Sequence, residues 1–158
     1  MADKRLPKRF VLDVDGVMTT GHFLYSEKGK AYKVFGPHDA DGLKMLKGKV
    51  DIFFITADKR GYDITKKRIV EDMGYRLKLV SEEKRERLFK EKLGYEDTIF
   101  MGDGIFDASI LSNCMCGIAP KNARPEARRA AAYVTPSPSG QGAVLEACLF
   151  ILKRYFND

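Results

Sequence analysis

The sequence predicts an α/β fold, a Rossmann-like doubly wound parallel sheet with helices on both faces. Short apolar segments typical of buried strands alternate with longer segments of helical periodicity, and glycines stand where the helices should end. One feature interrupts this alternation, because two strand-like segments at 23–26 and 31–35 flank a turn that contains Gly29. We therefore expect a β-hairpin insertion after the first strand.

The first strand is expected at 9–14, where the apolar run Phe10-Val11-Leu12 leads into Asp13. Later strands are expected at 50–56, 77–80, 98–102, 117–119 and 132–134. Helices are expected at 39–47, 60–73, 82–93, 106–112, 123–129 and 142–156. The segment 136–142 is rich in proline, serine and glycine and is expected to be a loop. A length of 158 residues predicts a single domain over 1–158.

Composition narrows the function classes. No segment approaches the roughly 18 apolar residues of a membrane span, and the charged start lacks the apolar core of a signal peptide. We therefore expect a cytoplasmic protein that does not bind membranes. Cys114, Cys116 and Cys148 provide neither a disulfide framework nor a zinc-binding spacing. The net charge of +6 would suit nucleic acid, but no aromatic residues are interleaved with the basic clusters, so we expect no nucleic-acid partner.

Two carboxylates, Asp13 and Asp15, follow the first strand, and Gly16 comes directly after them. Side chains at i and i+2 lie on the same side of a strand, and open parallel sheets bind ligands at the carboxyl ends of their strands. Like charges that close need a compensating cation, usually a metal, or a proton on one of them. The pair suits metal-assisted phosphoryl transfer, although a strand that simply ends in an acidic turn would have the same residues.

Three later segments place polar groups at the same edge of the expected sheet. Thr56 ends a strand with a hydroxyl that can donate to a phosphoryl oxygen or cap the next helix. Lys84 lies near the start of a helix, where the helix dipole disfavours a cation, so its placement indicates another task. Asp103 lies between two glycines, which let the backbone approach a ligand closely, and Asp107 follows four residues later.

These four segments, in this order, resemble the motifs of the haloacid-dehalogenase-like phosphohydrolases. The resemblance implies that Asp13 is a nucleophile that forms an aspartyl-phosphate, and that Asp15 acts as general acid and then general base. It also implies that Thr56 and Lys84 hold the phosphoryl oxygens and stabilise the developing charge.

The same resemblance implies a Mg²⁺ cofactor in an octahedral oxygen site. Its ligands would be the carboxylates of Asp13 and Asp103 together with Asp15, which would offer its backbone carbonyl. Asp107 would orient Lys84 or a metal-bound water from behind the ligands.

The chain leaves no room for the cap domain that many relatives have. The intervals from Asp15 to Thr56 and from Thr56 to Lys84 are too short once the hairpin and one helix are subtracted. In this respect the chain resembles the 3-deoxy-manno-octulosonate 8-phosphate phosphatases, the nonulosonate 9-phosphate phosphatases and the C-terminal domain of some acylneuraminate cytidylyltransferases. The matching pieces are the hairpin, Asp41-Gly42, and the segments 118–123 and 133–143. This resemblance implies a phosphorylated sugar acid as substrate and a homotetramer whose subunits cover one another's sites.

The chain departs from that group at three places. Ala57-Asp58 replaces a Gly-Arg pair, which favours a nine-carbon or otherwise different sugar. Ser139 and Gln141 replace part of a glycine-rich loop, and Gly104 stands where many relatives have a second aspartate. The candidate substrate contacts are Asp58, Gly102, Gly140 and Gln141.

Three other functions remain open alternatives. A regulatory or oligomerisation domain of the same fold would not need the metal-binding carboxylates. A receiver domain also uses Asp, Thr and Lys, but its acidic pair and acceptor aspartate lie on different strands, unlike Asp13 and Asp15. A nucleic-acid end phosphatase would fit the positive charge and would show salt-dependent binding to DNA.

Overall fold

The computed structural model describes residues 5–157; residues 1–4 and 158, the two ends of the expected domain, lie outside it. Six strands form one sheet in the order β5-β4-β1-β6-β7-β8, and every neighbouring pair is parallel. They are β1 Arg9–Asp13, β4 Asp51–Thr56, β5 Arg76–Leu79, β6 Thr98–Met101, β7 Cys116–Ala119 and β8 Tyr133–Val134. The predicted parallel sheet is confirmed, and β1 lies inside it, where an uninterrupted apolar run belongs.

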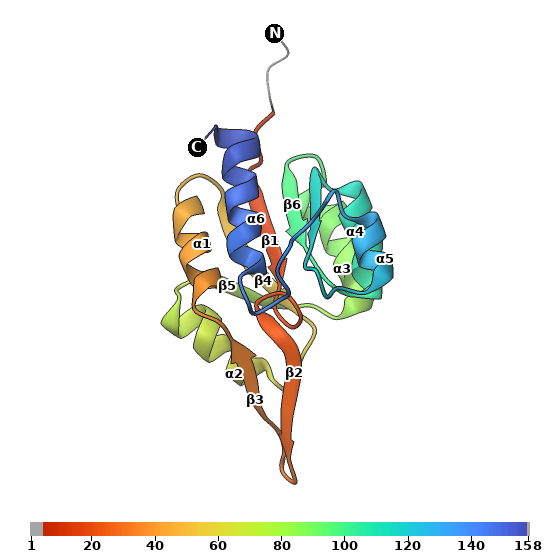
Figure 1. Cartoon of the computed structure of the whole chain (residues 1–158). Coiled ribbons are helices and arrows are strands. Elements are labelled where there is room, and N and C mark those ends of the chain that lie inside the picture. The colour runs from red at the N-terminus through yellow and green to blue at the C-terminus, as the bar shows by residue number, and fades with distance from the viewer. Residues whose placement is uncertain (1–4, 158) are drawn as a thin grey trace.

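Helices cover both faces of this sheet, as the doubly wound prediction requires (Figure 1). They are α1 His38–Leu46, α2 Tyr62–Lys66 continuing as Lys67–Asp72, α3 Glu82–Leu88 continuing as Phe89–Leu93, α4 Ala108–Asn113, α5 Pro125–Ala130, and α6 Ala143–Ile151 continuing as Leu152–Phe156. A short 3-10 turn, Ile105–Asp107, precedes α4. Within residues 5–157, no helix is both long and apolar enough to cross a membrane.

The residues of β1 alternate between two cores, which determines where the chemistry lies. Phe10 and Leu12 pack in the core under α1 and α6. Val11 packs in the opposite core, together with residues of α4 and α5 and with Phe89, which continues α3. Asp13 is two residues beyond Val11, so it shares that second face and points toward α3.

The predicted hairpin is confirmed and is longer than expected. β2 Thr19–Ser26 and β3 Gly29–Phe35 pair antiparallel, and Figure 1 shows them projecting from the body of the molecule beyond the end of β1. Residues 5–157 contain no cap domain beside this hairpin. The loop before α6 packs against the base of the hairpin. Gly140 of this loop lies so close to the backbone of Thr19 and Thr20 that a Cβ added to Gly140 would be 2.7 Å from the Thr20 nitrogen.

Asp39 connects α1 to α6. Its buried carboxylate accepts the backbone N–H groups of Val144 at 2.9 Å and Leu145 at 3.2 Å, so it caps the first turn of α6 from another helix. Burial raises the pKa of Asp39 above its usual value, against the opposing effect of these hydrogen bonds. The chain after β3 and the C-terminal helix are thereby fixed to each other.

Candidate active site

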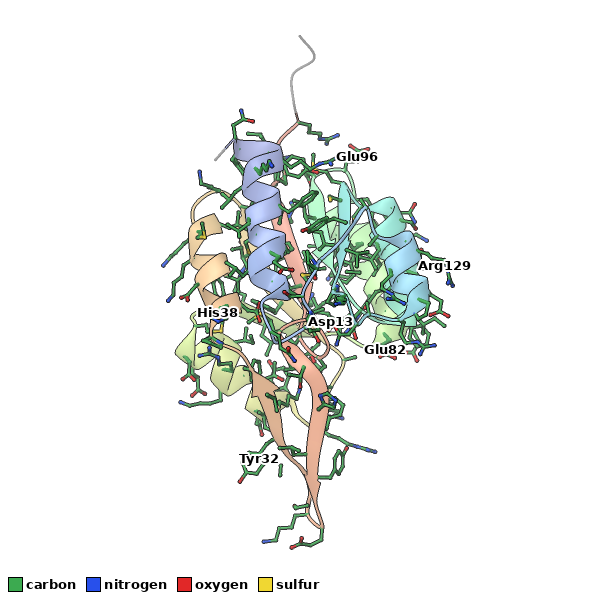
Figure 2. All side chains as sticks on the ribbon, viewed as in Figure 1. Asp13, Tyr32, His38, Glu82, Glu96 and Arg129 are labelled. Atoms are coloured by element: carbon green, nitrogen blue, oxygen red, sulfur yellow. The ribbon has the colours of Figure 1, made fainter. Side chains whose placement is uncertain are left out.

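A cavity of about 640 Å³ opens at the carboxyl ends of β1, β4 and β6. Its walls come from the turn after β1, the hairpin, the loop after β4, the start of α3 and the turn after β6. Asp13 lies at the centre of the molecule, where the body meets the hairpin, with Glu82 of α3 nearby (Figure 2). The predicted convergence of distant segments at one sheet edge therefore occurs around this aspartate.

Arg85 of α3 holds Asp13 in a two-pronged ion pair. Its Nη1 donates to Asp13 Oδ2 at 2.9 Å and its Nη2 donates to Asp13 Oδ1 at 3.0 Å. The same Nη1 donates to Asp107 Oδ1 at 2.8 Å, and only 4% of the Arg85 side chain is exposed. A buried guanidinium thus fixes the orientation of two carboxylates at once.

Asp13, Asp103 and Asp107 form one acidic group, each offering an oxygen within 4.8 Å of the others. Burial raises the pKa of Asp13 to about 7, with Asp107 adding to this and Arg85 opposing it. Burial and the charges of Asp13 and Asp107 raise the pKa of Asp103 to about 8. Three crowded carboxylates with one guanidinium retain a deficit of positive charge, and an oxygen-only donor set is what Mg²⁺ prefers. The residues present therefore fit a divalent cation.

Gly16 is the residue that lets Asp103 approach this group. Its φ of +79° favours glycine, and a Cβ there would overlap the Asp103 carboxylate. Asp107 shapes the same turn from the other side, because its Oδ2 accepts the backbone N–H groups of Asp103 at 3.1 Å and Gly104 at 2.9 Å. The turn after β6 is thus built around the acidic group.

The Asp15 carboxyl faces the hairpin instead of this acidic group. Lys33 of β3 lies 2.8 Å from Asp15 Oδ1 and 3.1 Å from Oδ2. The same ammonium lies 2.8 Å from Asp58, which is also paired with Lys30 at 2.7 Å. The carboxyls of Asp13 and Asp15 therefore lie in different surroundings. Asp13 belongs to the acidic group with Asp103 and Asp107, whereas Asp15 is ion-paired with the hairpin.

Comparison with known proteins identifies the family. Residues 86–147 match the family model described as haloacid dehalogenase-like hydrolase. The 3-deoxy-D-manno-octulosonate 8-phosphate phosphatase of Haemophilus influenzae is 30% identical over 151 residues, covering 92% of this chain and 83% of the relative. This chain belongs to the haloacid dehalogenase-like hydrolases. The corresponding phosphatase of Escherichia coli K12 is 27% identical over 154 residues, covering 90% of this chain and 77% of the relative.

Solved structures of other proteins resemble this chain over nearly its whole length. A Legionella pneumophila structure, described as a subfamily III A hydrolase of this superfamily, gives a TM-score of 0.82 at 28% identity and covers 95% of this chain and 84% of its own. The Moraxella catarrhalis 3-deoxy-D-manno-octulosonate 8-phosphate phosphatase, solved with magnesium, phosphate and KDO, gives 0.81 at 26% identity, covering 98% and 90%. A cobalt-bound Haemophilus influenzae structure gives 0.80 at 28% identity, covering 94% and 89%.

The hydrolase does not bring Lys84 into the cavity, contrary to the expectation from its sequence position. Lys84 is exposed and borders a different hollow, beside Lys59 and Leu79. The reason is helical phase: Arg85 lies four residues before the buried Phe89, so these two share the inward face and Lys84 points away.

Thr56 ends β4 as expected and is fully buried. Its Oγ1 accepts the backbone N–H of Asp58 at 3.2 Å, which leaves the hydroxyl hydrogen for another acceptor. The cavity wall at this point is formed by Ala57 and Asp58. Burial raises the pKa of Asp58, but hydrogen bonds from Lys30 and Lys33 outweigh it and bring that pKa to about 2. Asp58 is therefore ionised and neutralised by the hairpin.

Gly102, Gly140 and Gln141, which were expected to contact substrate, do not line the cavity. Gly102 gives space to the Asp107 carboxyl, which would lie 2.8 Å from a Cβ at that position. Gly140 is buried at the base of the hairpin, and the exposed Gln141 follows it outside the cavity wall. Sequence reasoning missed Arg85 and Lys33, whose side chains reach the site from a helix face and a strand face that no motif marks.

Proposed function

We propose that this hydrolase is a Mg²⁺-dependent phosphomonoesterase in which Asp13 is the nucleophile. The observation that supports this best is the arrangement at the end of β1. There Asp13, ion-paired with Arg85, lines the cavity together with Asp103 and Asp107. The chain also belongs to a family of hydrolases. A cation bound by these carboxylates would neutralise the charge of an incoming phosphate ester.

Asp13 acts at phosphorus and Asp15 acts at the leaving oxygen, the two atoms of the bond that breaks. An oxygen of Asp13 attacks phosphorus, and the bond from phosphorus to the ester oxygen breaks. Asp15 gives a proton to that leaving oxygen and then takes one from the water that releases phosphate from Asp13. Arg85, in the role expected of Lys84, orients Asp13 and supplies positive charge near the phosphoryl oxygens. The Thr56 hydroxyl donates a hydrogen bond to one of these oxygens.

For the substrate we propose a phosphorylated sugar acid of the octulosonate 8-phosphate or nonulosonate 9-phosphate type. The support is the similarity to 3-deoxy-D-manno-octulosonate 8-phosphate phosphatases and the KDO and phosphate bound in the Moraxella catarrhalis structure. The leaving-group side of the cavity is lined by Phe23, Lys30 and Asp58, so it offers one apolar ring and both signs of charge. Such a wall suits a polar ligand with a hydroxylated carbon chain.

We also propose that the protein assembles as a homotetramer through its hairpin. The hairpin exposes large apolar side chains: Phe23, Leu24, Tyr25, Tyr32 and Val34. Figure 2 shows Tyr32 on the part of the hairpin that projects from the body. A surface of this kind marks an interaction site. Deleting 23–35 should leave a smaller particle by light scattering, whereas a deletion product of unchanged size would exclude the hairpin as the interface.

We propose the cytoplasm as the location of this enzyme. All three cysteines, Cys114, Cys116 and Cys148, are free thiols, and two of them are buried. Free thiols fit a reducing compartment.

The test is phosphate release, with Mg²⁺ or with a chelator, from a panel of esters. The panel holds octulosonate 8-phosphate, nonulosonate 9-phosphates, common hexose phosphates and an aryl phosphate. We expect Mg²⁺-dependent preference for one sugar acid, and no turnover by a folded Asp13→Asn variant. Activity on the aryl ester alone would exclude the proposed substrate. No release from any ester, with Mg²⁺ still bound, would favour a regulatory domain of the same fold.

A further inference from the structure

Lys33 is a fully buried lysine on the inward face of the hairpin. It lies in β3 between Tyr32 and Val34, which are both exposed, while its own side chain is 0% exposed. Lysine is rarely buried without partners, because removing an ammonium from water is unfavourable unless it is hydrogen-bonded and paired. The contacts of Lys33 therefore indicate what it does.

Three side chains surround the Lys33 ammonium. Thr65 Oγ1 accepts a hydrogen bond from it at 2.8 Å and Asp15 Oδ2 accepts one at 3.1 Å. Asp15 Oδ1 and Asp58 Oδ2 each lie 2.8 Å away in ion pairs. These partners come from the turn after β1, the loop after β4 and helix α2, so one side chain ties the hairpin to three segments of the body.

The carboxylates of the site are fixed in different ways. Asp13 and Asp107 are held by Arg85 and by backbone N–H groups. Among the side chains of residues 5–157, Lys33 is the one that holds the Asp15 carboxyl by a hydrogen bond or ion pair. Replacing Lys33 would therefore remove the one hydrogen-bonding or ion-pairing side chain that the Asp15 carboxyl has within these residues.

We propose that Lys33 is a positioning residue that aims the Asp15 carboxyl at the leaving group. The ammonium contacts both oxygens of the carboxyl, at 2.8 and 3.1 Å, and so fixes the orientation of Asp15 in the cavity that this residue lines. The hairpin would accordingly set the geometry of proton transfer in addition to any part in assembly. This inference rests on the proposed function, because it assigns a role to Asp15 in ester hydrolysis.

Lys28 provides a matched control. It is a lysine on the same hairpin, in the exposed turn between β2 and β3, and it lies outside the cavity lining. Lys28→Met therefore makes the same chemical change as Lys33→Met without altering Asp15 or the cavity wall.

The experiment compares two esters that differ in their need for a proton. The leaving group of an alkyl phosphate is a basic alkoxide, so its hydrolysis depends on general acid catalysis. The nitrophenolate leaving group of an aryl phosphate is stable without a proton, so its hydrolysis does not. In Lys33→Met we expect kcat/KM for the alkyl ester to fall about 10- to 100-fold more than for the aryl ester. Lys28→Met should leave the ratio of the two values unchanged. In an Asp15→Asn background, Lys33→Met should have no further effect on the ratio.

Equal losses on both esters in Lys33→Met, or an equal change of the ratio in Lys28→Met, would overturn the proposal. Lys33→Gln keeps a polar donor for Thr65 and Asp58 but is shorter, so it serves if the methionine variant does not fold; the same shift of the ratio is expected. A wild-type protein that releases phosphate from neither ester would overturn the proposed function itself, and this role of Lys33 with it.

Discussion

Replacing Arg85 with methionine should destabilise the protein and abolish its activity, whereas the same change at Lys84 should do neither. Arg85→Met keeps the length of the side chain and removes its charge. It strands two buried carboxylates, because Asp13 loses contacts of 2.9 and 3.0 Å and Asp107 loses one of 2.8 Å. Lys84 has an exposed side chain outside the cavity and is the neighbouring control on the same helix.

The size of the effect follows from burial. Removing one partner of a buried ion pair costs about 3–5 kcal/mol, because the remaining charge is left without compensation. With a urea slope of about 2 kcal/mol per M, a loss of about 4 kcal/mol moves the unfolding midpoint down by about 2 M. The loss should be smaller at pH 6 than at pH 8, because Asp13, whose pKa is already raised to about 7 by burial, can take up a proton at the lower pH.

The assay is urea unfolding followed by circular dichroism in chelator, with phosphate release measured in Mg²⁺ on the same preparations. Lys84→Met should stay within about 0.5 kcal/mol of the wild type and keep its activity. Arg85→Lys should fall between, since an ammonium keeps the charge but cannot make the two-pronged contact. Equal stability of Arg85→Met and wild type, or an equal loss of activity in Lys84→Met, would refute this account of the site.

Three further predictions concern the metal site, its titration and the cap of α6. Gly16→Ala should weaken Mg²⁺ binding at least tenfold by calorimetry, since its Cβ would overlap the Asp103 carboxylate; unchanged affinity would contradict the assigned ligand group. Burial raises the pKa of Asp13 to about 7 and that of Asp103 to about 8, whereas both are about 4 in the unfolded chain. Between about pH 4 and pH 8 the folded metal-free protein therefore binds more protons than the unfolded chain does. The free energy of unfolding in chelator should therefore fall as pH rises from 5 to 8, and stabilisation by Mg²⁺ should be larger at pH 8 than at pH 6; a pH-independent effect of Mg²⁺ on the melting temperature would show that the ion does not displace these protons. Asp39→Ala should cost about 1–2 kcal/mol by removing the acceptor for the N–H groups of Val144 and Leu145, whereas Asp39→Asn, which keeps an acceptor, should cost less in the same denaturation assay.

The sheet and the position of the site could be predicted because they depend on local patterns. The short apolar run 10–12 is typical of a strand buried on both faces, and the carboxyl ends of parallel strands meet at one edge of the sheet. Asp13, Asp103 and Asp107 converge there as the strand ends predict. The hairpin followed from alternation around a glycine turn, although β2 begins at Thr19, further toward the body than the pattern indicated, and β3 begins at Gly29, within the expected turn.

The side chains that complete the site could not be predicted in the same way. Lys84 and Arg85 are adjacent cations, and only the rotation of α3 against the sheet, set by the burial of Phe89, decides which one enters. Lys33 depends on which face of the hairpin turns inward, a tertiary property that its own strand does not determine. Asp58 indicated an acidic substrate contact, but the structure pairs it with two hairpin lysines, so its charge is already neutralised.

The most direct test of the central claim is to trap the phosphoryl group on the enzyme. The protein is mixed with a sugar-acid phosphate and Mg²⁺ and quenched in acid within one turnover. The digested peptide that holds Asp13 is then analysed by mass spectrometry with fragmentation. The account predicts one added phosphoryl group on Asp13, lost when the reaction is left to run to completion and absent from Asp13→Asn. Phosphate release without any modification of Asp13, or with the group on another residue, would contradict it.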